Sequence, residues 1–207
     1  MLRDRRYSDL VPPDLPSLAR LAHALRAWPP DPLQDDAPPA AVATIVRPGE
    51  RSPEVLFIAR AVREGDPWSG DVAFPGGKRE VTDPSLVATA VRETFEEVGL
   101  VLPPSSFVTR LADVVGLSNG YRVAQLVFVL DERASEEAKP EPNAEVAALF
   151  WIPVTTLVDP AFVETTTIER LGNRFQVPSL RLGERTLWGM TYRMTEQLAR
   201  AMGVGPR

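Results

Sequence analysis

The chain has 207 residues, a formal net charge of −5 at pH 7 and no cysteine. This length suits one domain with an extension, and the acidic balance argues against a general binder of nucleic acids or membrane surfaces. The lack of cysteine excludes disulfides, thiol catalysis and thiolate zinc sites. The sequence has no apolar run of about 18 residues and no signal-like core near its start, so we expect a cytoplasmic protein.

Residues 1–39 are expected to form an extension ahead of a main domain at residues 40–207. Leucines at helical spacing between Asp14 and Trp28 predict an amphipathic helix, and the prolines that follow predict a stiff connector. This helix either packs on the main domain or acts as an arm in a homodimer. The single histidine, His23, lies within it, and one histidine cannot build a histidine-rich metal site.

The main domain begins with two predicted strands, at residues 41–46 and 55–60, on either side of a proline–glycine turn. A polar, turn-rich segment then leads to a short predicted strand at residues 72–74. Gly76 and Gly77 follow, and two glycines allow the backbone to approach a ligand or a metal closely.

The segment from Pro84 to Gly99 is predicted to be a helix. Asp83 is a suitable N-cap, Pro84 suits the first helical position, and Gly99 supplies the left-handed residue that ends a helix. Apolar residues at helical spacing form one stripe, which consists of Val87, Val91, Phe95 and Val98.

Three carboxylates, those of Glu93, Glu96 and Glu97, are expected to share a helix face that points away from this stripe. Carboxylates so close together repel one another, and a divalent cation removes that repulsion. Carboxylate oxygens are the ligands that Mg²⁺ and Mn²⁺ prefer. The alternative is an ordinary solvated acidic face.

The Gly-Gly turn, the arginine before the first glutamate and the glycine that closes the helix together resemble the Nudix box of the Nudix hydrolases. The residues that fit this pattern are Gly77, Arg92, Glu93, Glu96, Glu97, Gly99 and Leu100. Two features depart from it. Thr94 stands where the family usually has an aliphatic residue, and the spacing from Gly77 to Arg92 is one residue longer, with Asp83 or Glu80 as the upstream acid.

The longer spacing looks like the coenzyme A pyrophosphatase branch of the family. Three further segments resemble that branch, namely Gly70 with Phe74-Pro75-Gly76-Gly77, Gly120-Tyr121-Arg122-Val123 and Trp188-Gly189-Met190-Thr191. The branch normally has an arginine four residues before the glycine that corresponds to Gly70, and this chain has Asp66 at that position. Arg63 is a candidate to replace that arginine, and Trp68 either stacks on a base or packs a loop.

The elements expected after the box are strands at 107–115, 122–130 and 146–153, an acidic surface loop at 136–143, a hairpin of 175–182 with 185–188, and a helix at 191–202. Such a mixture of strands and helices implies an α/β sandwich. The resemblance implies the Nudix form of it, an α/β/α sandwich with a mixed sheet, here with an N-terminal helical extension.

The resemblance also implies roles for the residues of the box. Glu93 and Glu97 are expected to bind Mg²⁺ or Mn²⁺ directly, and Glu96 either binds a second metal or acts as the base for the attacking water. Arg92 is expected to orient these carboxylates by hydrogen bonds. In Nudix enzymes a backbone carbonyl of the glycine turn, here at Gly76, often completes the metal shell.

Glu145, just before the strand at 146–153, is expected either near the metals, where it positions water, or as an ordinary surface residue. The candidate phosphate-binding residues are Arg60, Arg63, Lys78 and Arg122, because cationic side chains bind phosphate oxygens.

The expected reaction is metal-dependent hydrolysis of the diphosphate of coenzyme A or a derivative, which yields 3′,5′-ADP and 4′-phosphopantetheine. The alternatives are another small-molecule nucleoside diphosphate derivative (a nucleoside triphosphate, NADH, ADP-ribose or a dinucleoside polyphosphate) and a catalytically silent Nudix module that binds a ligand. Nucleic acids and membranes are not expected as partners.

Overall fold

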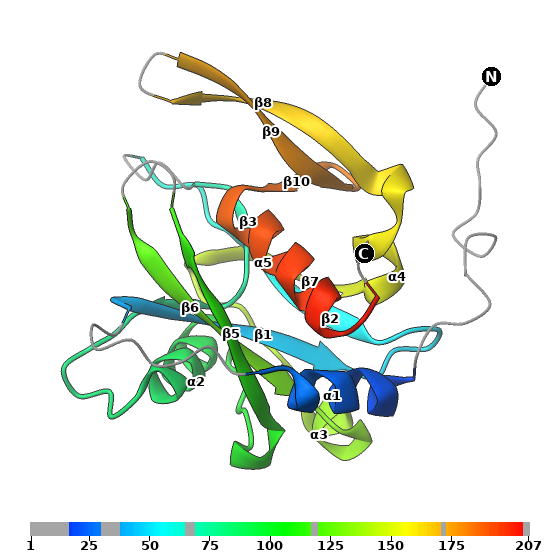
Figure 1. The fold of residues 1–207 in the computed structure, drawn as a ribbon. Helices are drawn as coiled ribbons and strands as arrows, with labels where there is room; N and C mark the ends of the chain where they lie inside the picture. Colours follow the sequence, from blue (N-terminus) through cyan, green and yellow to red (C-terminus); the bar gives the residue numbers. More distant parts are fainter. Residues whose placement is uncertain (1–16, 30–37, 65–68, 117–119, 171–172, 205–207) are drawn as a thin grey trace.

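The structure, a computed structural model, describes residues 17–29, 38–64, 69–116, 120–170 and 173–204 (Figure 1). Its centre is a seven-stranded sheet with the path β3-β2-β1-β6-β5, in which β4 also pairs with β1 and β7 with β2. The strands are β1 (Ala40–Arg47), β2 (Glu54–Arg60), β3 (Val72–Ala73), β4 (Gly76–Lys78), β5 (Phe107–Val115), β6 (Arg122–Val129) and β7 (Val146–Pro153). β1 and β6 pair in parallel and β1 and β2 are antiparallel, so the expected mixed sheet is confirmed.

Helices pack on both faces of this sheet. The helices are α1 (Leu18–Ala27), α2 (Leu86–Val98), α3 (Glu132–Glu137), α4 (Val154–Val158) and α5 (Gly189–Ala201). The side chains of β1 alternate between two apolar cores, because successive residues of a strand point to opposite faces. Ala41, Ala43 and Ile45 share one core with α2, whereas Ala40 and Val46 share the other with α1 and α5. The expected α/β/α sandwich is therefore confirmed.

α1 packs on the main domain. Ser17 caps its N-terminus, since the Ser17 side chain accepts a hydrogen bond from the backbone N–H of Arg20. Leu21 and Leu25 are buried in the same core as residues of β5 and α5. The packed alternative for this helix is thus what the structure shows, although the predicted start at Asp14 lies outside the described residues.

A second sheet of three strands projects from the body of the molecule (Figure 1). It consists of β8 (Val163–Arg170), β9 (Asn173–Leu182) and β10 (Arg185–Trp188), in the order β10-β9-β8. The predicted hairpin corresponds to β9 and β10, and β8 was not predicted. Leu180 and Leu187 at the base of this sheet are buried in the core that holds α5.

The predicted start of the box helix is wrong. α2 begins after Ser85, whose hydroxyl accepts a hydrogen bond from the backbone N–H of Ala88, so Ser85 and not Asp83 is the N-cap. The predicted end is confirmed, because Gly99 has a φ of 66°. The acidic segment predicted as a loop at 136–143 is helical in its first part, where α3 ends at Glu137.

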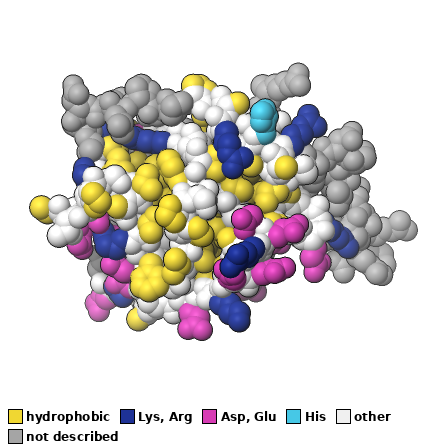
Figure 2. All heavy atoms as spheres, turned by 90° about the horizontal axis from the view of Figure 1, so that it is seen from below, with side chains coloured by type: hydrophobic (Ala, Val, Ile, Leu, Met, Phe, Trp, Pro, Cys, Tyr) yellow, Lys and Arg dark blue, Asp and Glu magenta, His cyan; other side chains and the backbone are white. Residues whose placement is uncertain are grey.

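The predicted apolar stripe on α2 is wrong in one residue. Val98 is buried and Val87 and Val91 are partly buried against the core, but Phe95 is 56% exposed. Figure 2 shows apolar and charged side chains gathered on the underside of the molecule, the side on which Figure 1 places α1, α2 and α3. In the part of the chain that the structure describes, no helix is long and apolar enough to cross a membrane.

Candidate active site

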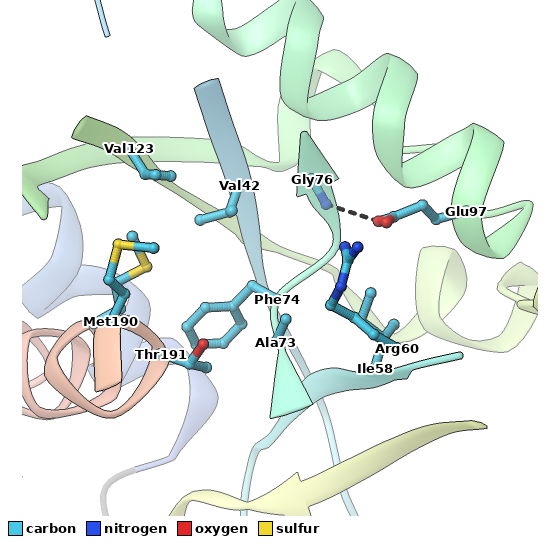
Figure 3. A pocket seen from close by; sticks show the side chains of 11 residues that line it. Val42, Ile58, Arg60, Ala73, Phe74, Gly76, Glu97, Val123, Met190 and Thr191 are labelled. Atoms are coloured by element: carbon cyan, nitrogen blue, oxygen red, sulfur yellow. Dashed lines mark hydrogen bonds between the residues drawn. The ribbon is translucent and has the colours of Figure 1, made fainter. Parts of the chain in front are cut away.

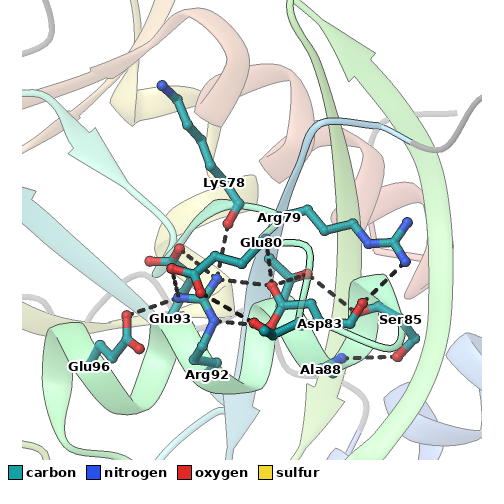
Figure 4. A network of polar contacts seen from close by, with 11 residues as sticks. Lys78, Arg79, Glu80, Asp83, Ser85, Ala88, Arg92, Glu93 and Glu96 are labelled. Atoms are coloured by element: carbon teal, nitrogen blue, oxygen red, sulfur yellow. Dashed lines mark hydrogen bonds and ion pairs between the residues drawn. The ribbon is translucent and has the colours of Figure 1, made fainter.

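Arg92, on α2, is the centre of a network of charged groups (Figure 4). Its Nε and Nη2 donate to the two carboxylate oxygens of Asp83 at 3.1 and 3.0 Å, and Nη1 donates to Glu96 at 2.9 Å. Nη2 also donates to the carbonyl oxygen of Lys78 at 3.0 Å and lies 3.1 Å from Glu93 Oε1. One guanidinium therefore connects α2 to β4 and to the loop that precedes the helix.

Asp83 is the buried anchor of this network, with 6% of its surface exposed. Besides Arg92, it accepts hydrogen bonds from the backbone N–H of Glu80 and from the Thr89 hydroxyl, both at 2.9 Å. The hydrogen bonds from Arg92, followed by that from the Glu80 N–H, hold the pKa of Asp83 well below its usual range. The sequence left Asp83 and Glu80 as alternatives for the upstream acid. In the structure Asp83 accepts hydrogen bonds from Arg92, whereas the exposed Glu80 lies 3.9 Å from Arg92.

The Gly-Gly turn lies against the carboxylates of Glu93 and Glu97. The backbone N–H of Gly76 donates to Glu97 Oε2 at 2.8 Å. Gly76 has a φ of 149°, and a Cβ there would lie 2.4 Å from the carbonyl oxygen of Ala41. A Cβ on Gly77 would lie 2.5 Å from Cδ of Glu93. Gly76 therefore requires glycine because of the backbone of β1, whereas a side chain at position 77 would displace the flexible end of Glu93.

Burial raises the pKa of Glu97 to about 7, although the Gly76 N–H and the charge of Arg60 act in the opposite direction. Burial also raises the pKa of Glu93, which the neighbouring Arg92 opposes. Glu97 is only 5% exposed, so the predicted acidic face that points away from the core is wrong for this residue. The sequence reasoning failed here because residues of the β1–β4 pair cover that side of the helix.

Glu96 has a different environment from its two neighbours. Its side chain is 52% exposed and is bound by Arg92, while its carbonyl oxygen accepts a hydrogen bond from Asn143 Nδ2. Among the described residues, no group of three or more His, Cys, Asp or Glu side chains is arranged to hold a metal ion. The structure thus brings Glu93 and Glu97 to the glycine turn and leaves Glu96 exposed in an ion pair with Arg92.

A cavity of about 120 Å³ opens beside Glu97, between α5 and the central sheet (Figure 3). Arg60, Glu97 and Gly76 form its polar end. The rest of its lining is mostly apolar and comprises Val42, Ile58, Ala73, Phe74, Val123, Met190, Thr191 and Met194. Sequence reasoning missed the contribution of α5, although the Trp188–Thr191 segment was among those that resemble the branch.

The remaining candidates lie around this centre. Arg63 and Glu145 form an exposed ion pair at 3.0 Å, and the charge of Glu145 contributes to the raised pKa of Glu97. Arg122 lies 3.7 Å from Asp113 in an ion pair. The Lys78 side chain points away from the Arg92 network (Figure 4).

Two residues of the substrate hypothesis, Asp66 and Trp68, lie outside the described residues. Asn143 was not anticipated. Its side chain donates to the Glu96 carbonyl and accepts from the Glu145 N–H at 2.7 Å, and so links the end of α2 to the start of β7. No pattern in the sequence marked this asparagine, because the link joins segments that are far apart along the chain.

Comparisons with known proteins agree with this geometry. A family model described as NUDIX domain matches residues 37–169. The uncharacterized Nudix hydrolase NudL of Photorhabdus laumondii is 32% identical over 136 residues, which cover 66% of this chain and 71% of that protein. NudL of Salmonella paratyphi B is 31% identical over 179 residues, which cover 79% of this chain and 84% of that protein.

Among solved structures, a MutT/nudix family protein from Enterococcus faecalis has a similar fold. The match has a TM-score of 0.51 and 17% sequence identity, and it covers 91% of this chain and 75% of that one.

Proposed function

The chain belongs to the Nudix hydrolase family, and we propose that within this family it cleaves the diphosphate of coenzyme A or of a coenzyme A derivative. The family acts on nucleoside diphosphate derivatives, so the chain is a hydrolase of phosphoric anhydride bonds. The observation that carries the proposal is the placement of Glu93 and Glu97 against the Gly76–Gly77 turn, with Glu97 at the polar end of a cavity that Arg60 also lines.

The residues at this turn fit a divalent cation. The donors are oxygens, which suit Mg²⁺ or Mn²⁺, and burial disfavours the charged forms of both carboxylates until a cation balances them. Glu93 and Glu97 would hold the ion, with a carbonyl of the turn at Gly76 as a further donor. Nudix hydrolases generally need such ions, which neutralise charge that develops on the phosphate oxygens and activate water.

The chain's own groups would perform the remaining tasks. Arg92 holds Glu93 and Glu96 in place through its anchorage to Asp83, so it acts on the carboxylates and not on the substrate. Arg60 lines the polar end of the cavity, where a guanidinium suits a phosphate oxygen. The attacking water would lose its proton to Glu96 or Glu145, both of which have exposed side chains.

Support for coenzyme A as the substrate comes from the sequence. The three segments at residues 70–77, 120–123 and 188–191 resemble the coenzyme A branch, and Arg63 is available near the position where that branch has its arginine. Arg122 and Lys78 stay candidates for contacts with the 3′-phosphate or the diphosphate.

A product assay tests the proposal. The protein is incubated with coenzyme A, NADH, ADP-ribose and nucleoside triphosphates, each with Mg²⁺, with Mn²⁺ or with a chelator, and the products are identified by mass. We expect metal-dependent formation of 3′,5′-ADP and 4′-phosphopantetheine that is faster than any other cleavage. Faster cleavage of another diphosphate would reject coenzyme A, and no cleavage of any of them would favour a silent binding module.

A further inference from the structure

The cavity beside Glu97 has two chemically different ends (Figure 3). Arg60, Gly76 and Glu97 form the end where a diphosphate would lie. The other end lies between α5 and the sheet, where Met190 and Met194 face apolar side chains of β1 and β6. Because both ends belong to one cavity, a group attached to the diphosphate has access to the apolar end.

A nucleobase or a ribose does not suit the apolar end. Of the described residues that line it, Thr191 is the one with a polar side chain. A base carries ring nitrogens and exocyclic groups, and a ribose carries hydroxyls, and each such group loses its hydrogen bonds to water when it is buried without a partner. The lining therefore favours a small, branched hydrocarbon group next to a phosphate.

Coenzyme A carries such a group. In its pantetheine chain, the carbon beyond the phosphate-bound methylene bears two methyl groups. In NADH, ADP-ribose and dinucleoside polyphosphates, by contrast, a ribose stands at each end of the phosphate chain. We propose that the apolar end of this cavity binds the two methyl groups of the pantetheine chain. This inference rests on the proposed coenzyme A substrate and says where one part of that molecule binds.

The wall formed by α5 is fixed by a buried hydrogen-bond network. Gln125 on β6 is fully buried, and its Nε2 donates to the carbonyl oxygen of Met194 at 3.0 Å and to the Thr44 hydroxyl at 3.1 Å. Its Oε1 accepts from Gln197 Nε2 at 3.1 Å. These bonds hold Met194 at a set distance from the sheet, so the cavity has a defined width before the substrate binds.

The test compares coenzyme A with an analogue in which hydrogens replace the two methyl groups. For the wild-type protein we expect kcat/KM to be at least about 10-fold higher for coenzyme A, since each buried methyl group contributes to discrimination. Ala73→Leu fills the cavity and Met190→Ala enlarges it, so either change should reduce this preference several-fold toward unity. Met202→Ala removes the same atoms from the end of the same helix, outside the cavity lining, and should leave the preference unchanged.

The outcomes separate the two proposals. A wild-type protein that does not cleave coenzyme A rejects the proposed function, and the methyl assignment with it. If coenzyme A is cleaved but the wild-type protein shows no preference over the analogue, or if Met190→Ala keeps the full preference, the methyl groups bind elsewhere and the assignment is rejected alone. Should Ala73→Leu fail to fold, Met190→Ala decides the question, because truncation leaves the backbone of α5 unchanged.

Discussion

At the scale of single residues, Glu97 and Gly77 have the most demanding positions. Glu97 is a carboxylate buried beside a second carboxylate, and the hydrogen bond from Gly76 only partly compensates for its lost hydration. Gly77 has no room for a side chain because Glu93 occupies the space where its Cβ would be. The buried charge of Glu97 raises the free energy of the metal-free protein.

Replacing Glu97 by Gln is expected to lower the activity and to raise the stability of the metal-free protein. Gln keeps an acceptor for the Gly76 N–H but cannot neutralise a metal ion, so kcat should fall by about 100-fold or more. In the metal-free protein at pH 8, the same change removes a buried charge and should increase the free energy of unfolding by an amount on the order of 1–3 kcal/mol. Steady-state kinetics and urea unfolding in chelator measure the two effects.

Glu137→Gln, a change at an exposed position on α3, is the control for the Glu97 variant. Full activity of Glu97→Gln would remove Glu97 from the metal site. A loss of stability in chelator at pH 8 would show that the buried charge is not destabilising.

Gly77→Ala is expected to displace the Glu93 carboxylate, because its methyl group would occupy the same space. Because this carboxylate is the far end of a flexible side chain and can move, the free energy of unfolding should fall by no more than about 1 kcal/mol. In a Glu93→Ala background the space is free, so the same Gly77→Ala change should have little effect on stability. Thermal unfolding of the wild-type protein, the two single variants and the double variant gives the coupling energy between the two positions. Equal losses of stability on Gly77→Ala in both backgrounds would contradict the contact.

At the scale of elements, the site depends on how α1, α2 and α5 are held against the sheet. Arg92 and Asp83 fix the N-terminal half of α2 to the loop that precedes it, and Gln125 fixes α5 to β6. α1 contributes Leu25, which is fully buried in the core shared with β5 and α5. The N-terminal helix is thus part of the structural support for the cavity wall.

Leu25→Ala should lower the free energy of unfolding by about 2–5 kcal/mol, because it opens a cavity in this core. The elution volume in gel filtration should stay unchanged if the helix packs only within its own chain. Leu18→Ala, at a partly buried position of the same helix, is the milder control. A change from dimer to monomer with unchanged stability would instead support the role of a dimer arm.

At the scale of the whole molecule, the shifted pKa values of three carboxylates predict how stability depends on pH. The pKa of Glu97 is raised from 4.5 to about 7, so this group destabilises the folded state progressively as pH rises through that interval. The raised pKa of Glu93 acts in the same direction. The lowered pKa of Asp83 has the opposite effect, since its contribution is complete above its unfolded pKa and is lost on acidification.

The melting temperature in chelator should therefore decrease between about pH 5 and pH 8. Mg²⁺ or Mn²⁺ binds the ionised carboxylates and should raise the melting temperature more at pH 8 than at pH 5. Calorimetry with and without metal measures both effects, and Glu97→Gln should weaken both. An increase in melting temperature by metal that is equal at the two pH values would contradict the assignment of Glu93 and Glu97 as ligands.

Much of the fold was predictable because its strands are marked by β-branched and apolar runs between turn residues. The strand at 107–115 was predicted with the bounds that the structure has, and the strands at 41–46 and 55–60 within a residue at each end. β8 was missed because Glu164 and three successive threonines lack an apolar alternation, and β9 pairs with it along its whole length. The start of α2 was misplaced because Asp83 and Ser85 are both good capping residues, and Asp83 is used by Arg92.

The sequence by itself determined the family and the set of box residues, because those depend on spacing along a single turn and helix. The tertiary structure decided which carboxylates share an environment. It placed Glu93 and Glu97 at the glycine turn, where Glu97 is buried and Glu93 partly buried, and left Glu96 exposed beside Arg92, a division that depends on where β1 and β4 lie over the helix. It also brought Met190 and Met194, about a hundred residues later in the chain, into the cavity of Glu97, and contacts over such separations leave no local pattern.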